Sequence, residues 1–389
     1  MTEPGRGAPL RLGVDLTPLA RGAAGIGSYV RGLVGARAAF GDGVQVSGWA
    51  NRPSLARPRL AGVDLAGLRV THTRVPRRLL NRLWLDRGVG GIEDFMGPLD
   101  VFHATDLVAP RARAAAVVLS VHDLAWCDEP AGVTPELRAF LGRWFAPSLA
   151  RADAVLVPSR ATARALARRF PQLACPVHVV PYGVDADFRA DAEDADATVR
   201  ARHGLPPTYV LYVGALDPRK GVRGLVPAHE ALRELAPEAP PLVIVGPDAG
   251  SLASIRAQVA KTTGPVQVLG AVARDDLPAI YRGARAFVFP SDHEGFGLPV
   301  LEAAACGVPV VCTAIAALEE LAGSFAKLVP APAKPRTLAK ALAAVLRESG
   351  VERERRVSAG RARAAELTWE RCAVSTAAVY RAALPRRAR

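Results

Sequence analysis

The stretch Ser291–Pro309 reads SDHEGFGLPVLEAAACGVP and combines a glycine-rich loop with a short helical pattern. It follows the apolar run Ala286–Phe289, which we predict to be a buried strand. Pro299 suits the first turn of a helix, and Gly307 ends that helix before a second apolar run, Val308–Cys312. A strand, a helix and a strand in this order predict parallel strands joined by a crossover helix, the unit of α/β folds.

The same alternation runs through the rest of the chain. Short apolar runs rich in β-branched residues alternate with longer stretches rich in Ala, Leu and Arg. Continuous apolar runs are typical of parallel strands covered by helices on both faces, so we predict doubly wound α/β architecture. The other predicted strands are Leu10–Leu16, Val44–Trp49, Val101–Ala104, Ala116–Val121, Ala154–Pro158, Val177–Pro181, Tyr209–Val213, Leu242–Val245 and Val266–Leu269.

The predicted strands form two groups, separated by an acidic, Ala-rich stretch without strand signals. A chain of 389 residues has the length of two domains of about 100–200 residues each. A helical pattern with Trp369, Val374 and Tyr380 as apolar anchors follows, and we expect it to cross back to the first domain. The expected parts are an N-terminal Rossmann-like domain (1–187), a linker (188–207), a second α/β domain (208–370) and the C-terminal helix (371–389).

The composition is that of a globular protein, with 50% hydrophobic and 22% charged residues. The formal net charge of +13 favours anionic partners such as nucleotides, phospholipid surfaces or nucleic acid. A general bias towards Ala and Arg explains this excess equally well. We expect no nucleic-acid partner, because no helix-turn-helix, zinc-finger or RNP-type pattern accompanies the charge.

The cysteines and the apolar runs bear on the cellular compartment. Five cysteines without a CxxC pair indicate neither a disulfide framework nor a zinc site. The start, Met1–Leu10, has no apolar core of a signal peptide. The longest apolar run, Ala303–Leu318, is interrupted by Gly307 and Pro309 and is shorter than the roughly 20 residues that span a bilayer. We therefore expect a cytoplasmic protein without a membrane-spanning segment.

The loop Ser291–Leu298 predicts a ligand site. It brings free backbone N–H groups and the positive end of a helix dipole to one place, where phosphate binds well. Because Pro299 has no N–H, we expect the amide of Leu298 to contribute. Glu294 in the loop and Glu302 one turn into the helix flank this place, and carboxylates pair with vicinal hydroxyls of a sugar or ribose. The alternative is that Glu302 only favours the helix N-terminus and Glu294 is solvated.

A second candidate is the segment Val213–Val222, VGALDPRKGV, directly after the predicted strand Tyr209–Val213. Asp217-Pro218 and Gly221 predict a turn, which carries Arg219 and Lys220. Two adjacent cations at the carboxyl end of a strand are placed to neutralise a diphosphate. The alternative is an ordinary exposed basic turn.

Two weaker candidates lie in the N-terminal half. Gly22, Gly25 and Gly27 in RGAAGIGSY (residues 21–29) predict a flexible loop before a helix, although the dinucleotide fingerprint G-x-G-x-x-G is absent. His122 follows a predicted strand and is placed either to hydrogen-bond a sugar hydroxyl or to be a structural histidine held by Asp123. His103 follows a neighbouring strand in a similar way.

No HExxH, DxD-type or Cys/His cluster is present in the sequence, so we expect no bound metal. The segment Arg74–Arg87, RVPRRLLNRLWLDR, combines apolar residues near helical spacing with four or more cations. It is placed to lie on an anionic membrane, but an ordinary packed surface helix explains the pattern better. The apolar residues are Leu79, Leu80, Leu83 and Trp84, and the charge comes from Arg77, Arg78, Arg82 and Arg87.

Taken in chain order, these segments resemble the large family of retaining glycosyltransferases called family four or group one. GIGSYVRGL, DVFHA, VHDL, VPS and VPYGVD fall where this family has its first glycine loop, its strand ends and its approach to the second domain. VGALDPRKGV resembles the family's phosphate turn, and EGFGLPVLEAAACGVPVV closely resembles its E-x(7)-E donor motif. The resemblance covers most of the chain and implies the GT-B fold, two Rossmann-like doubly wound domains facing across a cleft.

The resemblance also implies roles for residues of the second domain. Arg219 and Lys220 would neutralise the donor diphosphate, Glu294 would hold hydroxyls of the transferred sugar, and Glu302 would hold the nucleotide ribose. Backbone amides of Phe296, Gly297 and Leu298 would contact the sugar and phosphate, and the backbone near Val272 would read the base.

In the first domain, the resemblance implies that Gly25 and Gly27 let the chain approach the diphosphate and that His122 faces the sugar across the cleft. The chain departs from the family pattern at Ala215 and Ser28, where many members carry arginine. The second departure leaves open which contacts the first domain makes to acceptor and phosphate.

The activity implied by the resemblance is metal-independent transfer of a hexose from a nucleotide diphosphate sugar, the co-substrate, with no further cofactor. PRKG together with EGFGLPVLEA is similar to bacterial members that use GDP-mannose, which favours mannose. The acceptor, whether glycan, lipid-linked or small molecule, stays open, as does peripheral contact with the inner face of a membrane. An inactive nucleotide-sugar-binding partner subunit and a sugar-nucleotide epimerase or phosphorylase remain alternatives, because a fold does not decide a reaction.

Overall fold

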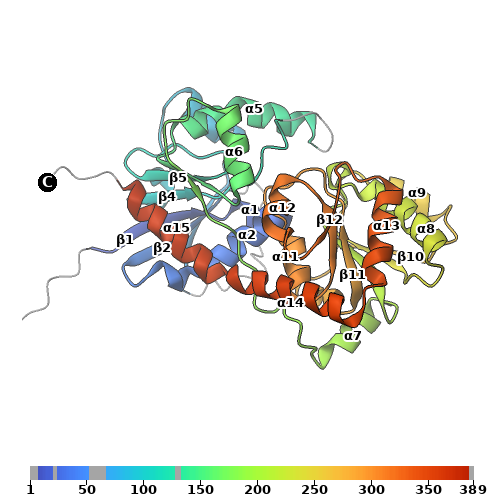
Figure 1. Ribbon diagram of the computed structural model, residues 1–389. Coiled ribbons are helices and arrows are strands. Elements are labelled where there is room, and N and C mark those ends of the chain that lie inside the picture. The colour runs from blue at the N-terminus through green and yellow to red at the C-terminus, as the bar shows by residue number, and fades with distance from the viewer. Residues whose placement is uncertain (1–7, 21–23, 52–66, 128–132, 385–389) are drawn as a thin grey trace, which may run out of the picture. The chain divides into compact units, whose positions relative to one another are not determined.

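The computed structural model describes residues 8–20, 24–51, 67–127 and 133–384, which form two compact units (Figure 1). The first unit comprises Met1–Asp128, Thr134–Gly183 and Trp369–Arg389, and the second consists mainly of Val184–Thr368. The chain therefore leaves the first unit after Gly183 and returns to it at Trp369.

The first unit is built around a parallel seven-stranded sheet in the order β3-β2-β1-β4-β5-β6-β7. Leu12 of β1 lies opposite Val46 of β2 and Val101 of β4. The central strands β4, β5 and β6 are buried along their whole length, as expected for apolar runs covered on both faces. The strands are β1 (Leu10–Asp15), β2 (Val44–Asn51), β3 (Arg69–Thr73), β4 (Val101–Ala104), β5 (Ala116–Ser120), β6 (Ala154–Val157) and β7 (Val177–Val179).

Helices connect and cover these strands. The side chain of Thr134 accepts a hydrogen bond at the start of α5, and Ser159 does the same for α6, so both helices begin at an N-cap residue. The helical elements of this unit are α1 (Thr17–Ala20), α2 (Ala24–Gly35), η1 (Arg37–Phe40), α3 (Arg77–Asn81), η2 (Arg82–Asp86), α4 (Glu93–Met96), α5 (Pro135–Ala150), α6 (Arg160–Arg169) and α15 (Trp369–Ala383).

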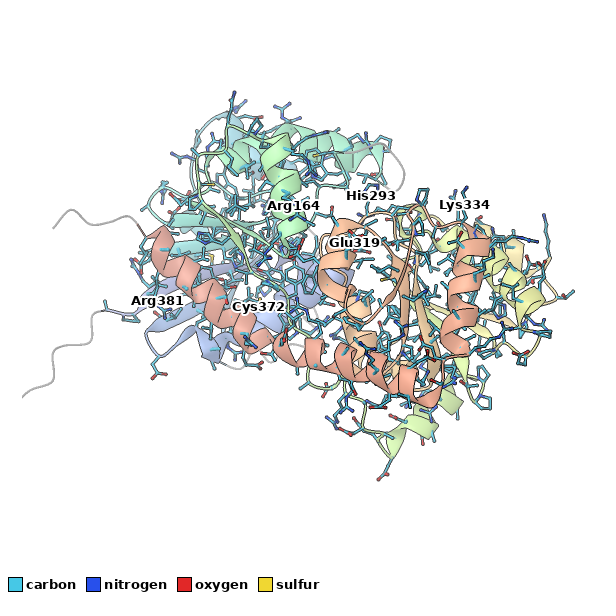
Figure 2. The ribbon with its side chains drawn as sticks, in the orientation of Figure 1. Arg164, His293, Glu319, Lys334, Cys372 and Arg381 are labelled. Atoms are coloured by element: carbon cyan, nitrogen blue, oxygen red, sulfur yellow. The ribbon has the colours of Figure 1, made fainter. Side chains whose placement is uncertain are left out.

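The C-terminal helix α15 packs against α2, η1 and β5 of the first unit. Gly32 of α2 allows the close approach, because a Cβ there would lie 2.0 Å from the Trp369 ring. Trp369 and Tyr380 are buried, but the expectation that Val374 is a third anchor is wrong: Val374 is 56% exposed. Cys372, labelled on α15 in Figure 2, is buried instead, because the buried stripe follows the helical repeat from Trp369.

A chain of buried hydrogen bonds joins α15 to the sheet. His103 of β4 is fully buried, with Nδ1 2.7 Å from the hydroxyl of Tyr380 and Nε2 2.8 Å from Oγ of Ser120. Oγ of Ser120 lies 3.1 Å from the hydroxyl of Tyr29 on α2. Burial lowers the pKa of His103 to about 3, so its imidazole is neutral at ordinary pH.

The second unit is built around a parallel six-stranded sheet in the order β10-β9-β8-β11-β12-β13. The chain winds outward from β8 to β10, returns to place β11 beside β8, and winds outward on the other side. Leu211 of β8 lies opposite Val243 of β9 and Phe287 of β11. The strands are β8 (Tyr209–Val213), β9 (Leu242–Val245), β10 (Val266–Gly270), β11 (Ala284–Phe289), β12 (Val310–Thr313) and β13 (Lys327–Val329).

The stretch 188–207, which we expected to be a linker, contains the helix α7 and belongs to the second unit. Nη2 of Arg282 lies 2.5 Å from Oδ1 of Asp196, and both side chains of this ion pair are buried. The helical elements of the unit are α7 (Ala195–Arg202), η3 (Pro218–Lys220), η4 (Val222–Gly224), α8 (Leu225–Leu235), α9 (Leu252–Val259), η5 (Arg274–Asp276), α10 (Leu277–Arg282), α11 (Leu298–Ala305), α12 (Ala316–Ala322), α13 (Pro335–Leu346) and α14 (Gly350–Glu366).

The predicted fold class is confirmed, since both units are doubly wound α/β structures with parallel sheets. Every predicted strand is present, with small shifts at the ends. The sequence prediction missed β3 and β13, which both lie at a sheet edge. An edge strand is less buried and carries more polar residues, so its apolar signal is weaker.

Candidate functional site

The candidate site lies in the second unit, where the winding of its sheet reverses. The strands β8 and β11 are neighbours there, and their crossover helices lead away in opposite directions. In open α/β sheets, ligands bind beyond the carboxyl ends of the strands at such a switch point. The loop after β8 carries Arg219 and Lys220, and the loop after β11 carries Glu294.

The turn after β8 is locked onto the loop after β11. Asp217 caps η3 by accepting from the amide of Arg219 at 3.0 Å. Gly221 follows with φ +66°, and a Cβ there would lie 2.1 Å from the carbonyl oxygen of Pro290. The amide of Asp292 donates to the carbonyl of Arg219 at 3.0 Å. A glycine is therefore required at 221, both for its backbone conformation and for this contact.

This docking brings Lys220 to Glu294. Nζ of Lys220 lies 2.5 Å from Oε1 of Glu294, and the side chains are only 15% and 10% exposed. The ammonium also lies 6.0 Å from the centre of the Phe289 ring, within the range of a cation–π interaction. The alternatives of a solvated Glu294 and an exposed basic turn are therefore wrong.

The second cation of the turn is paired locally. Nε of Arg219 donates to Oδ2 of Asp217 at 2.9 Å. The structure thus holds both cations, which the sequence predicted, and a carboxylate partner for each. The sequence predicts only a turn at Asp217, because its contact with Arg219 depends on side-chain geometry that the sequence does not show.

The helix α11 starts beside this charge cluster. Gly297 precedes it with φ +106°, and a Cβ there would lie 2.5 Å from Cδ2 of Leu318. No side chain of the described residues caps this helix start, and Pro299 in the first turn has no N–H. Phe296 is buried and Leu298 half-buried, while His293, labelled in Figure 2, is exposed on the same loop. The positive helix end is therefore available to an anion.

Glu302 lies within α11 and is buried. The hydroxyl of Tyr281 donates to its Oε2 at 2.9 Å, and Nη1 of Arg274 lies 3.5 Å from its Oε1. Burial raises the pKa of Glu302, while the Arg274 guanidinium and the Tyr281 hydroxyl counteract this rise. Two side chains thus contact the Glu302 carboxylate. The alternative that Glu302 only favours the helix N-terminus does not account for these contacts.

Val272 is half-buried and lies between β10 and η5, two residues before Arg274. The structure therefore places the segment expected to read a base next to the surroundings of Glu302. Sequence reasoning missed Arg274 and Tyr281. Arg274 opens η5 and Tyr281 lies in α10, and neither residue type nor spacing along the chain pointed to Glu302.

The remaining candidates belong to the first unit. Gly25 and Gly27 lie in the first turn of α2, so the expectation of a loop over residues 24–29 is wrong, whereas residues 21–23 lie outside the described residues. Among the described residues, no atom lies within 4 Å of the position that a Cβ would take at Gly25.

His122 is buried, and both of its ring nitrogens are engaged. Nδ1 bonds the hydroxyl of Tyr182, and Nε2 lies 2.7 Å from the carbonyl oxygen of Thr105. Burial lowers the pKa of His122. The geometry favours a structural histidine, although its partners are Tyr182 and Thr105 rather than Asp123.

The described residues contain no group of three or more His, Cys, Asp or Glu side chains placed to hold a metal ion. No helix in the described part of the chain is long and apolar enough to cross a membrane. The structure brings together Arg219, Lys220 and Glu294, followed by Gly297 and Leu298 at the start of the helix that carries Glu302.

Comparison with known families finds two matches that follow one another along the chain. Residues 23–188 match the family described as "Glycosyltransferase Family 4", and residues 197–363 match "Glycosyl transferases group 1". The second match contains the whole candidate site of the second unit.

Individual proteins are similar as well. The O-antigen chain mannosyltransferase B of Escherichia coli is 29% identical over 72% of this chain and 74% of its own length. The D-inositol 3-phosphate glycosyltransferase of Salinispora arenicola is 32% identical over 60% of this chain, a match that spans 55% of that protein. The sucrose-phosphate synthase structure from Thermosynechococcus elongatus superimposes with a TM-score of 0.74 at 24% identity, covering 96% of this chain and 98% of that one.

Proposed function

The chain belongs to the group 1 glycosyltransferases of family 4, and we propose that it transfers mannose from GDP-mannose to an acceptor with retention of the anomeric configuration. Membership makes the protein a glycosyltransferase that uses a nucleotide sugar. The choice of mannose is supported by the similar mannosyltransferase of Escherichia coli and by the segments PRKG and EGFGLPVLEA.

The observation that carries this proposal is the contact between Lys220 and Glu294 at the switch point of the second sheet. A cation beside the positive end of α11 suits the diphosphate of the donor. A carboxylate within 2.5 Å of that cation suits hydroxyls of the sugar attached to the same diphosphate. The loops after β8 and β11 thus offer complementary groups to both the diphosphate and the sugar of a nucleotide sugar.

In the proposed reaction, the bond between the anomeric carbon and the diphosphate oxygen breaks, and the acceptor oxygen bonds to that carbon on the same face. Negative charge develops on the leaving diphosphate, where Lys220, Arg219 and the N–H groups at the start of α11 stabilise it. The proton of the acceptor hydroxyl passes to an oxygen of the leaving phosphate. Glu294 holds the sugar, and Glu302 holds the ribose.

We propose that this transfer needs no metal ion, because Lys220, Arg219 and the start of α11 offer positive charge where the diphosphate would bind. Transfer should persist in EDTA at the rate measured without chelator. Loss of activity in EDTA, restored by Mn²⁺ or Mg²⁺, would contradict this part of the proposal.

The donor is best tested by thermal unfolding with GDP, UDP, dTDP and ADP. A ligand at 100 times its Kd should add about 2.7 kcal/mol to the free energy of unfolding. We expect the largest shift with GDP and, in a transfer assay, release of GDP from GDP-mannose. A preference for UDP would overturn the choice of donor but not the family, whereas no shift with any of the four would count against nucleotide binding.

The acceptor is proposed at the level of chemical class. The two relatives are named for an O-antigen chain and for D-inositol 3-phosphate, a glycan and a phosphorylated small molecule. We favour a glycan carried on a lipid, used in the cytoplasm at the inner face of the membrane. Transfer to lipid-linked glycans, compared with transfer to inositol phosphates, tests this choice.

Contact with an anionic membrane would rest on charge rather than on insertion. In the segment 74–87, Leu80 and Trp84 are buried, and the guanidinium of Arg77 lies 5.0 Å from the Trp49 ring. Leu79 of the same segment is 47% exposed, and Arg78, Arg82 and Arg87 are exposed too, so only part of the apolar face packs inward. Binding to vesicles that contain anionic phospholipid should therefore be weak and lost at high salt.

A further inference from the structure

One guanidinium group lies between two carboxylates beside the candidate ribose site. Arg274 donates from Nε to Oδ2 of Asp185 at 3.0 Å, and its Nη1 lies 3.5 Å from Oε1 of Glu302. Asp185 is 89 positions away in the chain, in the segment where the second unit begins. The arrangement is built by three separate segments and is not a helix-surface pair.

The guanidinium is fixed on several sides. Its central carbon lies 5.2 Å from the centre of the Phe188 ring. Both Arg274 and Asp185 are 24% exposed, so the ion pair lies at the edge of solvent while Glu302 is 8% exposed behind it. Asp185 therefore holds the arginine at a set place, and one arm of the fork reaches the buried carboxylate.

The other groups around Glu302 do not replace that positive charge. Tyr281 of α10 donates one hydrogen bond from a neutral hydroxyl. Asp185 adds a negative charge that disfavours the ionised form of Glu302. Cys306, directly after the helix that carries Glu302, has a pKa raised by burial above its ordinary range and stays a neutral thiol. Arg274 is the cation that contacts Glu302 among the described residues.

An isolated buried carboxylate takes up a proton rather than stay charged without a partner. A protonated Glu302 would lose acceptor capacity, because one oxygen becomes a hydroxyl. Two vicinal ribose hydroxyls need two acceptor positions on the carboxylate. The charge state of Glu302 therefore decides whether it can hold a ribose.

We propose that Arg274 is a positioning residue for the nucleotide, whose guanidinium, held by Asp185, keeps the buried Glu302 carboxylate ionised and oriented toward the ribose hydroxyls. The inference rests on the proposed role of Glu302. Arg274 lies outside the E-x(7)-E segment, and its role would make nucleotide binding depend on pH.

The test compares Arg274→Met and Arg274→Lys with the wild type by calorimetric titration with GDP between pH 6.5 and 9. The Kd ratio of Arg274→Met to wild type should be about tenfold at pH 6.5 and fall to about twofold or less at pH 9, because a higher pH favours the ionised carboxylate even without the cation. Arg274→Lys keeps a cation and should largely restore the ratio at low pH. Using ratios removes the titration of GDP itself.

Two controls separate the possible causes. Asp185→Asn breaks the outer ion pair and removes a negative charge that disfavours ionised Glu302, but it keeps the cation, so its Kd ratio should vary with pH less than that of Arg274→Met. Inorganic pyrophosphate has no ribose, so its binding to Arg274→Met should match the wild type. If Arg274 only stabilises the packing of Asp185 and Phe188, Arg274→Met and Asp185→Asn should lower thermal stability equally. The Kd ratio of Arg274→Met would then not change with pH, which would overturn the inference.

The proposed role of Glu302 is tested separately by Glu302→Gln. If Glu302→Gln weakens GDP binding while Arg274→Met does not, the role of Glu302 stands and the inference about Arg274 fails. If neither variant affects GDP binding at any pH, the role of Glu302 itself is wrong. Tighter binding by Arg274→Met would also overturn the inference, since it would show that the arginine competes with the ribose.

Discussion

Lys220 and Glu294 are 74 positions apart in the chain, yet their side chains form a hydrogen-bonded ion pair at 2.5 Å. Each charge has low exposure and has the other as its partner. Glu294 already pairs with the Lys220 ammonium, so a bound diphosphate would compete with that carboxylate for the same cation. The cation should therefore contribute most when charge on the leaving group increases, in the transition state.

Lys220→Ala should lower kcat by about 10²–10³, with a smaller change in GDP affinity. The physical reason is the loss of the cation that faces the developing phosphate charge. Steady-state kinetics with GDP-mannose measures the effect, and Lys261→Ala, which changes an exposed lysine of the same unit, is the matched control. A near wild-type kcat for Lys220→Ala would show that the turn after β8 does not act on the phosphate.

Glu302→Ala and Glu294→Ala should separate nucleotide binding from sugar transfer. A hydrogen bond to a charged group contributes roughly 1.5–3 kcal/mol, so Glu302→Ala should weaken GDP binding about tenfold or more. Glu294→Ala removes a partner of Lys220 and of the sugar, so GDP binding should change by less than about twofold while transfer falls strongly. Titration of both variants with GDP decides this, and equal losses of GDP affinity would refute the division of roles.

At the scale of elements, the site depends on two short connections. The turn η3 packs against the end of β11 at Gly221, and Gly297, directly before α11, lies close to Leu318 of α12. Both glycines have positive φ and little room for a side chain. The turn that carries Lys220 and the loop that carries Glu294 are therefore placed by close packing at these two glycines.

Gly221→Ala should destabilise the protein more than Gly204→Ala. The two glycines have φ of +66° and +60°, so the backbone strain is similar and costs about 1 kcal/mol in each variant. A Cβ at 221 meets the carbonyl of Pro290 at 2.1 Å, whereas the nearest atom at 204 is 3.9 Å away. Urea unfolding measures the difference, and transfer activity should fall only in Gly221→Ala. Equal destabilisation would mean that the turn is not locked onto Pro290.

At the scale of the whole molecule, the chain ends in the unit in which it begins, because α15 belongs to the first unit. The helix is held there by the Trp369 contact with Gly32 and by the hydrogen bonds of Tyr380, His103 and Ser120. The buried imidazole makes this attachment depend on pH, since it is neutral in the folded protein.

Stability should fall as the pH decreases from about 6.5 toward 3. The pKa of His103 is about 3 in the folded state and lies near 6.5 when unfolded, so in this window only the unfolded chain takes up the proton. Urea unfolding at several pH values measures the decline. Imidazole NMR signals provide the direct check, and a charged His103 in the folded protein at pH 5 would contradict the assignment.

Tyr380→Phe tests the same attachment at constant pH. It removes one hydroxyl from the buried network and leaves Nδ1 of His103 without this partner, at a cost of about 1–3 kcal/mol in the free energy of unfolding. Val374→Ala lies on the exposed face of the same helix and is the control. If both variants unfold at the same urea concentration, the network does not hold α15.

The sequence by itself determined the fold class, the positions of the central strands and the segments that form the candidate site. These depend on local properties, because a buried parallel strand needs a continuous apolar run and a glycine loop before Pro299 specifies a helix start. It did not determine the helical position of Gly25 and Gly27, the burial of both His122 nitrogens, or the edge strands β3 and β13. In these cases the local signal was weak or suited more than one structure.

Only the tertiary structure decided which charges meet. Lys220 reaches Glu294 because β8 and β11 are neighbours at the point where the winding reverses. Arg274 reaches both Asp185 and Glu302 because η5 follows β10 and lies near the entry of the chain into the second unit. Such contacts depend on the order of strands in the sheet and on side-chain directions set by packing. Residue type and spacing along the chain do not contain this information.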